Sequence, residues 1–125
     1  MVQNSIFQPV FAPSGEASGG KNMASAPIDI THLAQQTMND AELQREVLRI
    51  FIDQLAAARR EIPAAEGEDR TRLAHKLKGA ARAVGAFALS DCAERLMLQP
   101  DDAKALKQLD GLADEASRFA QLLAG

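Results

Sequence analysis

The stretch Ala74-His75-Lys76-Leu77-Lys78-Gly79-Ala80-Ala81-Arg82-Ala83-Val84-Gly85 sets one histidine among basic and very small residues. An α-helix advances about 100° per residue, so the two sides of this stretch can be compared directly. The residues within roughly 60° of His75 are basic or lack a side chain: Arg72, Lys78, Gly79 and Arg82. The residues more than about 130° away are apolar: Leu73, Leu77, Ala80 and Val84. The pattern predicts a helix that buries its apolar side and exposes His75.

Gly79 lies one helical turn beyond His75 on the same predicted side. A glycine inside a helix costs about 0.5 to 1 kcal/mol relative to alanine, so its presence calls for a reason. Either the missing side chain lets the backbone of another molecule reach the imidazole, or it allows two helices of this protein to cross closely. The position of Gly79 beside His75 favours the first explanation.

Basic residues surround His75 although the chain is acidic, with 14 Lys and Arg against 17 Asp and Glu and a net charge of −3. Arg72, Lys76, Lys78 and Arg82 are the basic residues of this segment, and no carboxylate lies between Arg72 and Arg82 in the sequence. Clustered cations indicate a bound anion, and phosphate is an anion that histidine can carry covalently. Nearby positive charge also favours the neutral imidazole, whose free nitrogen can attack.

The segment from His75 to Ala81, His-Lys-Leu-Lys-Gly-Ala-Ala, followed by Val84-Gly85, resembles the signature of histidine-phosphotransfer (HPt) domains, His-x-Leu-Lys-Gly-(Ser/Ala)-(Ser/Ala). The resemblance continues upstream through residues 28–33 and 46–51 and downstream through Leu89, Cys92 and Leu96. It therefore covers about residues 28 to 123.

This resemblance implies a role for each residue of the motif. His75 is expected to be the phosphoacceptor, Lys78 to steady the phosphoryl group, and Gly79 to leave room for the active-site loops of a partner. The expected partner-binding residues lie on the exposed side of this helix and at the start of the next: Arg72, Lys76, Gly79, Arg82, Ala83 and Ala86.

Met97 departs from the family pattern. Many family members carry Gln or Glu at this position, where a polar side chain helps to orient the histidine ring. A methionine is not expected to do so, and we therefore expect support for the ring from a main-chain carbonyl, from Glu94 or from water.

The composition indicates one small helical domain. The chain has 125 residues, of which 46% are hydrophobic and 4% aromatic, with neither Trp nor Tyr. Such a content suits helices packed through short side chains. The single cysteine, Cys92, excludes an internal disulfide and is expected to be a small core residue in a reducing compartment. We find no signal peptide, membrane span or basic stripe, so we expect a cytoplasmic protein that binds neither membrane nor nucleic acid.

The order of sequence features predicts an all-α fold. Residues 1–26, rich in Pro, Gly and Ser, are expected to form a flexible arm in which Phe7 and Phe11 are incidental, and residues 27–125 to form the domain. Helices are expected over about 29–38, from an N-cap at Asn39 to about 65, over 68–83, over 86–98, and after Asp102. Pro63 is expected to end or kink the second helix, and Gly67 and Gly85 to separate the third from its neighbours. The expected architecture is an antiparallel up-and-down four-helix bundle with a short extra N-terminal helix.

Other helix positions carry specific expectations for the core. The apolar side of the second helix is predicted to be buried along Leu43, Val47, Ile50, Phe51, Leu55, Ala58 and Ile62. That of the fourth helix is predicted at Leu89, Cys92, Ala93 and Leu96. His32, in the short first helix, is expected to be a partly exposed packing residue.

The resemblance implies a phosphocarrier that passes a phosphoryl group between His75 and receiver-domain aspartates in a bacterial two-component phosphorelay. Its expected partners are response-regulator receiver domains and a hybrid histidine kinase, and the receiver would supply the Mg²⁺. The sequence contains no Gly-x-x-x-x-Gly-Lys-(Ser/Thr) motif for ATP, so we expect no kinase activity and no cofactor, and we expect a monomer.

Three other functions compete with this one. A non-catalytic helical adaptor could bind a signalling partner through the same side of the helix. A histidine-kinase dimerisation module would need an acidic residue after the histidine, where this chain has Lys76. A metal site at His32 and His75 would lack an organised set of further ligands.

Overall fold

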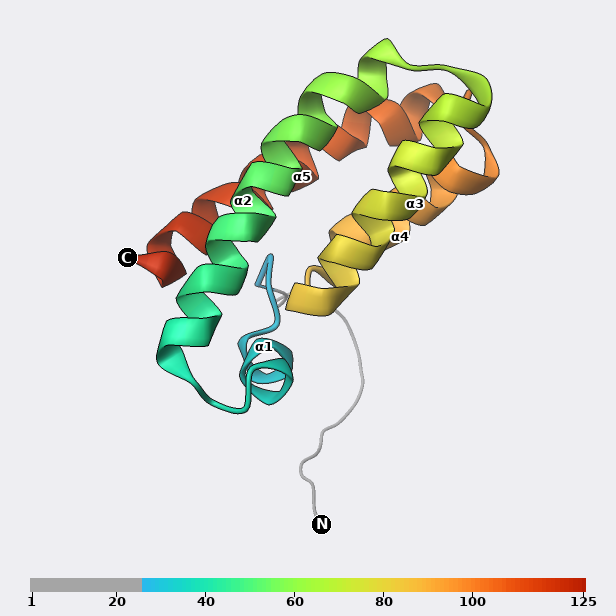
Figure 1. The fold of residues 1–125 in the computed structure, drawn as a ribbon. Coiled ribbons are helices and arrows are strands. Elements are labelled where there is room, and N and C mark those ends of the chain that lie inside the picture. Colours follow the sequence, from blue (N-terminus) through green and yellow to red (C-terminus); the bar gives the residue numbers. More distant parts are fainter. Residues whose placement is uncertain (1–25) are drawn as a thin grey trace.

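The computed structural model describes residues 26–125 of the protein, and this part of the chain is helical without strands. Its helices are α1 (Ile30–Gln36), α2 (Ala41–Ala64), α3 (Gly67–Val84), α4 (Phe87–Leu98) and α5 (Ala103–Ala124). The chain runs up α2, down α3, up α4 and back along α5 (Figure 1). The all-helical prediction is confirmed. The expected arm, with Phe7 and Phe11, lies outside the described residues apart from Ala26.

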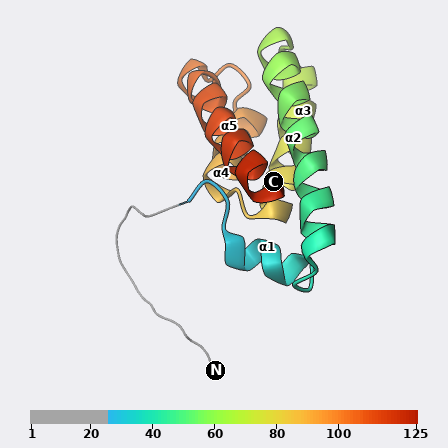
Figure 2. The same ribbon diagram turned by 90° about the vertical axis from the view of Figure 1, so that its left-hand side faces the viewer.

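Each of the four longer helices packs against two of the others, so that they surround one core. The packed pairs are α2 with α3, α3 with α4, α4 with α5, and α5 with α2. Helix α1 contacts α3 and lies across one end of the longer helices (Figure 2). The largest fully buried side chains are aliphatic with one phenylalanine: Phe51, Ile28, Leu33, Leu48, Leu55, Ile62, Leu89, Leu96 and Leu109. No helix within residues 26–125 is long and apolar enough to cross a membrane.

Aspartates begin three of the helices. The carboxylates of Asp29, Asp40 and Asp102 accept hydrogen bonds from backbone N–H groups in the first turns of α1, α2 and α5, at 3.0 to 3.1 Å. These bonds satisfy donors that have no partner within the helix. The predicted N-cap at Asn39 is therefore wrong by one residue. Asn39 instead has a φ of 59°, which asparagine tolerates better than most residues.

The buried sides of α2 and α3 differ in part from the predicted stripes. Leu43 and Ile50 of α2 are exposed, because Leu43 stands in the first turn and Ile50 borders an open groove between α2 and α3. In α3 the fully buried residues are Ala74, Leu77, Ala81 and Val84. Leu73 and Ala80 line the same groove and are only partly buried. Leu77 and Val84 are thus buried as predicted, whereas Ala74 and Ala81 take the places predicted for Leu73 and Ala80.

Arg70 connects the last turn of α2 with the loop between α4 and α5, at the end of the bundle remote from α1. Its guanidinium donates to the carbonyl oxygens of Ile62 at 3.0 Å, Pro63 at 3.2 Å and Pro100 at 2.6 Å. Carbonyls in the last turn of a helix have no helical donor, so Arg70 supplies what the end of α2 lacks. Helix α2 ends one residue after Pro63, and Gly67, with a φ of +57°, begins α3, which agrees with the predicted break.

The opposite end is closed by the turn between α3 and α4. Gly85 has a φ of +87° and its carbonyl accepts a hydrogen bond from Asp29 N–H at 2.9 Å. Next to it, Nε2 of His32 donates to the carbonyl oxygen of Arg82 at 3.0 Å, and the His32 ring meets Phe87 edge-on with centroids 5.1 Å apart. His32 is a partly buried packing residue, as predicted.

We expect Gly85→Ala to lower the free energy of unfolding by about 1 to 3 kcal/mol. Its positive φ disfavours a side chain, and a Cβ there would lie 2.9 Å from the carbonyl oxygen of Asp29. The matched control is Gly111→Ala in α5, where a Cβ meets no atom within 4 Å; it should raise stability by about 0.5 to 1 kcal/mol. Urea unfolding followed by circular dichroism measures both. Equal stability of Gly85→Ala and the wild type would contradict the tight turn.

Candidate functional site

His75 lies in the middle of α3 with its side chain exposed, as the helical pattern predicts. Its ring contacts the neighbouring helix: Nδ1 lies 3.2 Å from the thioether sulfur of Met97 on α4. A thioether sulfur has lone pairs but no proton, so it can only accept a hydrogen bond, and it accepts weakly. The geometry therefore favours, in a neutral ring, a proton on Nδ1, and it leaves Nε2 open to an incoming group.

The structure places Met97 against the ring, at a position where a methionine was not expected to support it. A hydropathy pattern counts methionine as apolar and does not register the weak acceptor strength of its sulfur. Glu94 does not support the ring, since its carboxylate pairs with a different residue of α3. The sulfur of Met97 is the ring contact that the described structure provides.

Lys78 is the cation that α4 holds beside His75. Its ammonium lies 3.4 Å from Oε1 of Glu94, and the Lys78 side chain is 24% exposed against 44% for Glu94. Lys78 follows His75 by three positions on α3, and Met97 follows Glu94 by three positions on α4. Both contacts thus belong to one antiparallel register, and the two helices build the site together.

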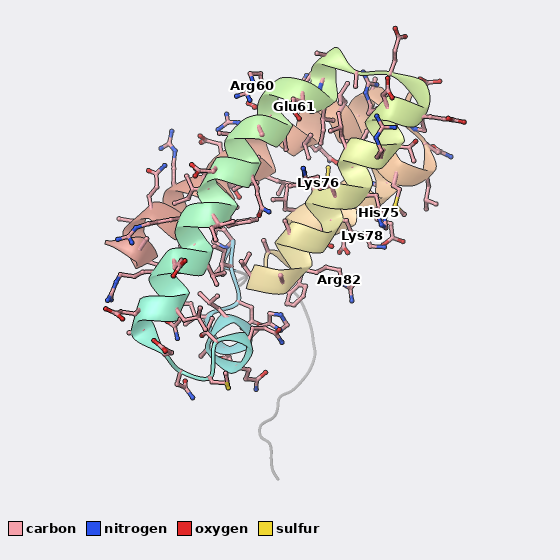
Figure 3. All side chains as sticks on the ribbon, viewed as in Figure 1. Arg60, Glu61, His75, Lys76, Lys78 and Arg82 are labelled. Carbon is pink, nitrogen blue, oxygen red and sulfur yellow. The ribbon has the colours of Figure 1, made fainter. Side chains whose placement is uncertain are left out.

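Of the four basic residues predicted around His75, Lys76 lies on a different side of α3, and Arg72 has a carboxylate partner. Arg72 pairs with Asp69 at 2.8 Å, and Lys76 lies toward α2, where it lines the groove together with Asp53 and Glu61. Figure 3 shows Lys76 on the side of α3 that faces α2, and His75 and Lys78 on the other side. Carboxylates from a preceding turn and from α2 and α4 balance the charge. These carboxylates lie outside positions 72–82 in the sequence, so the sequence of that segment alone does not reveal them.

Gly79 faces open space. It is exposed, and a Cβ added to it would meet no atom of the described structure within 4 Å. The alternative explanation, a close helix crossing inside the protein, is therefore wrong. The explanation that remains is room for another molecule next to His75.

Only one of the two alanines expected to bind a partner is on the surface. Ala83 is exposed, whereas Ala86 is 0% exposed and belongs to the core, so its side chain is not available to a partner. Ala86 stands in the tight turn before α4, and its N–H donates to the carbonyl oxygen of Ala81 at 2.8 Å. The next residue, Phe87, is 41% exposed and provides the apolar surface that sequence reasoning missed. An aromatic residue directly after a helix-ending Gly85 turn was the available signal.

Cys92 is a core residue, as predicted. It is fully buried, and its thiol donates to the carbonyl oxygen of Ala105 at 3.2 Å. Burial raises the pKa of the Cys92 thiol, an effect that nearby Arg95 only partly offsets. A thiol with a raised pKa is a poor nucleophile, so Cys92 takes no part in the chemistry of this surface.

Metal binding by the described chain has no structural support. Within residues 26–125, no three side chains of His, Cys, Asp or Glu are grouped so as to hold a metal ion. His32 and His75 each contact other groups, the first the carbonyl of Arg82 and the second Met97.

The comparison with protein families agrees with this arrangement. The sequence model described as Hpt domain matches residues 24–121, which is most of the chain. The chain belongs to the Hpt domain family. Hpt domains are helical phosphocarrier modules of two-component signalling without kinase activity of their own, and they interact with receiver domains and kinases. The searches of curated proteins and of solved structures found no match.

Within this Hpt domain, the carboxylate of Glu94 pairs with the ammonium of Lys78 at 3.4 Å, and its negative charge would oppose a phosphoryl group that approaches His75. We expect Glu94→Gln to increase the rate at which His75 is labelled by phosphoramidate, a small phosphoryl donor, by several-fold. The label is followed as acid-labile, base-stable phosphate by mass spectrometry. The control is Asp91→Asn, an exposed residue of α4 that lines a hollow against α5 and should change nothing. Slower labelling of Glu94→Gln would show instead that Glu94 holds Lys78 in its working position.

Proposed function

We propose that this Hpt domain relays a phosphoryl group between receiver-domain aspartates through His75 in a bacterial two-component phosphorelay. The observation that carries the proposal is the contact of Nδ1 of the exposed His75 with Met97. With Nδ1 engaged, Nε2 is the nitrogen available to a phosphoryl group. Lys78 adds positive charge one turn away, and the open space at Gly79 admits a partner.

In the proposed reaction, the lone pair of Nε2 attacks the phosphorus of an aspartyl phosphate on a receiver domain. The new N–P bond forms as the P–O bond to the aspartate breaks, and the aspartate leaves as a carboxylate. The reverse process delivers the phosphoryl group to another receiver. Positioning and charge account for this kind of transfer. The chain is proposed as a carrier rather than an enzyme, with the Mg²⁺ in the acidic pocket of the receiver.

Lys78 is proposed to exchange partners during the reaction. In the described structure its ammonium is paired with Glu94 at 3.4 Å, and both side chains are partly exposed. An ion pair in contact with water is worth at most about 1 kcal/mol, so a phosphoryl group with more charge can displace the carboxylate. Lys78 would then neutralise the group bound to Nε2 without any change in the backbone.

The proposed docking surface is the exposed side of α3 together with the start of α4. It comprises the residues around His75 that reach solvent: Arg72, Gly79, Arg82, Ala83 and Phe87. Lys76 lies toward α2 and would act as a more distant charge. The four longer helices are proposed to serve as an antiparallel up-and-down scaffold for this surface, and the protein as a cytoplasmic monomer that binds no nucleic acid and no membrane.

Phosphoryl transfer from a panel of phosphorylated receiver domains of the same organism tests the proposal. We expect acid-labile, base-stable label on the wild type and none on His75→Gln, because the amide provides no nucleophilic nitrogen. The receiver that transfers most efficiently identifies the pathway. If no receiver labels the wild type although all are competent with a control Hpt domain, the protein is a non-catalytic adaptor.

Gly79→Ala separates folding from docking. Since a Cβ at this position meets nothing inside the described structure, we expect the free energy of unfolding to rise by about 0.5 to 1 kcal/mol. Transfer from a receiver should nevertheless slow by an order of magnitude or so, because the methyl group occupies space that the partner needs. The control, Gly111→Ala, should be stabilised equally with unchanged transfer. Unchanged transfer by Gly79→Ala would refute the role of Gly79 as clearance.

A further inference from the structure

The contact between His75 and Met97 joins a nucleophilic ring to an oxidisable sulfur. Nδ1 and Sδ are 3.2 Å apart, Met97 is partly buried against the core, and His75 is exposed. The contact therefore lies where the core meets the surface, within reach of small solutes. The other methionine in the described part of the chain, Met38, is 81% exposed and lies at the turn between α1 and α2.

The proton distribution of a neutral imidazole depends on the acceptor that each nitrogen meets. A thioether is a weak acceptor, so Met97 favours the form with a proton on Nδ1 only slightly. That form is the one whose Nε2 carries the lone pair. A stronger acceptor in the same place would increase the fraction of rings that are ready to attack.

We propose that Met97 is an oxidation site that controls His75. A lone pair of Sδ attacks one oxygen of hydrogen peroxide, the O–O bond breaks, and the departing oxygen takes up the remaining proton and leaves as water. The sulfur is oxidised to the sulfoxide as the peroxide is reduced. The sulfoxide oxygen, a strong acceptor, then takes the hydrogen bond from Nδ1.

The flexibility of the methionine side chain allows the sulfoxide oxygen to replace the sulfur as the acceptor of the hydrogen bond from Nδ1. The gap of 3.2 Å between Nδ1 and Sδ leaves no room for an inserted oxygen, so the side chain must turn until the oxygen faces the ring. Because Met97 is only partly buried, its sulfoxide oxygen can also contact water. A polar sulfoxide is therefore less costly here than in a fully buried position. The effect on phosphoryl transfer rests on the proposed function, whereas the effect on the ring does not.

Nitrogen-15 spectra of histidine-labelled protein, recorded where both rings are neutral, test the effect on the ring. Treatment with hydrogen peroxide should shift His75 toward the form with a proton on Nδ1, and methionine sulfoxide reductases should reverse the shift. Met97→Gln should resemble the oxidised protein without treatment, and Met97→Leu should not respond. His32 is an internal reference, because its Nε2 donates to the Arg82 carbonyl and should keep its proton. An unchanged His75 ring after conversion of Met97, verified by peptide mass spectrometry, overturns the proposal.

Transfer from the preferred receiver measures the consequence. The oxidised wild type and Met97→Gln should transfer several-fold faster than the reduced wild type, and Met97→Leu should be slower and insensitive to peroxide. Met38→Leu, remote from the site, should leave the response intact. Equal rates for oxidised and reduced protein would overturn the control of His75 by Met97. A shifted ring in a protein that no receiver labels would support the oxidation site and refute the phosphorelay function.

Discussion

The antiparallel pairing of α3 with α4 is the constraint on which the site depends. Gly85 turns the chain in a left-handed conformation, so α4 returns directly along α3. Small buried residues such as Ala74, Ala81 and Ala93 line these two helices and allow their backbones to approach. In that register His75 meets Met97 and Lys78 meets Glu94. Neither helix carries the site alone, and the rest of the fold holds the pair in place.

The ion pairs of Arg59 and of Lys78 differ in what they contribute to the protein. On α2, Arg59 binds Asp110 and Asp114 of α5. These carboxylates raise the pKa of the guanidinium, first of all through the hydrogen bond that Arg59 donates to Asp110. This contact joins two long helices on the side away from His75. Lys78 is held by a single carboxylate at a longer distance. The ion pairs of Arg59 hold α2 against α5, whereas the single ion pair of Lys78 leaves a cation that can change its partner.

The sequence predicted the helices and the exposed histidine because both follow from the spacing of apolar residues along one chain. His75, Gly79 and the Gly85 turn lie where the pattern placed them. The surroundings of His75 were predicted less well, since they depend on α2 and α4, whose rotation relative to α3 is a matter of packing. The packing of α3 turns Lys76 toward α2, and the tight turn before α4 buries Ala86. The role of Met97 was missed for a chemical reason, because a hydropathy pattern does not register the lone pairs of sulfur.

The exposed side of α3 carries little of the packing that stabilises the protein. Residues such as Arg72, Arg82 and Ala83 reach solvent, while the core residues of α3 and α4 face inward. Substitutions at exposed positions usually change stability by no more than about 0.5 kcal/mol. After a gene duplication, a copy of this domain can therefore change the residues that we propose for partner binding without compensating changes in the core. The two copies can then come to bind different partners while the fold of the domain stays the same.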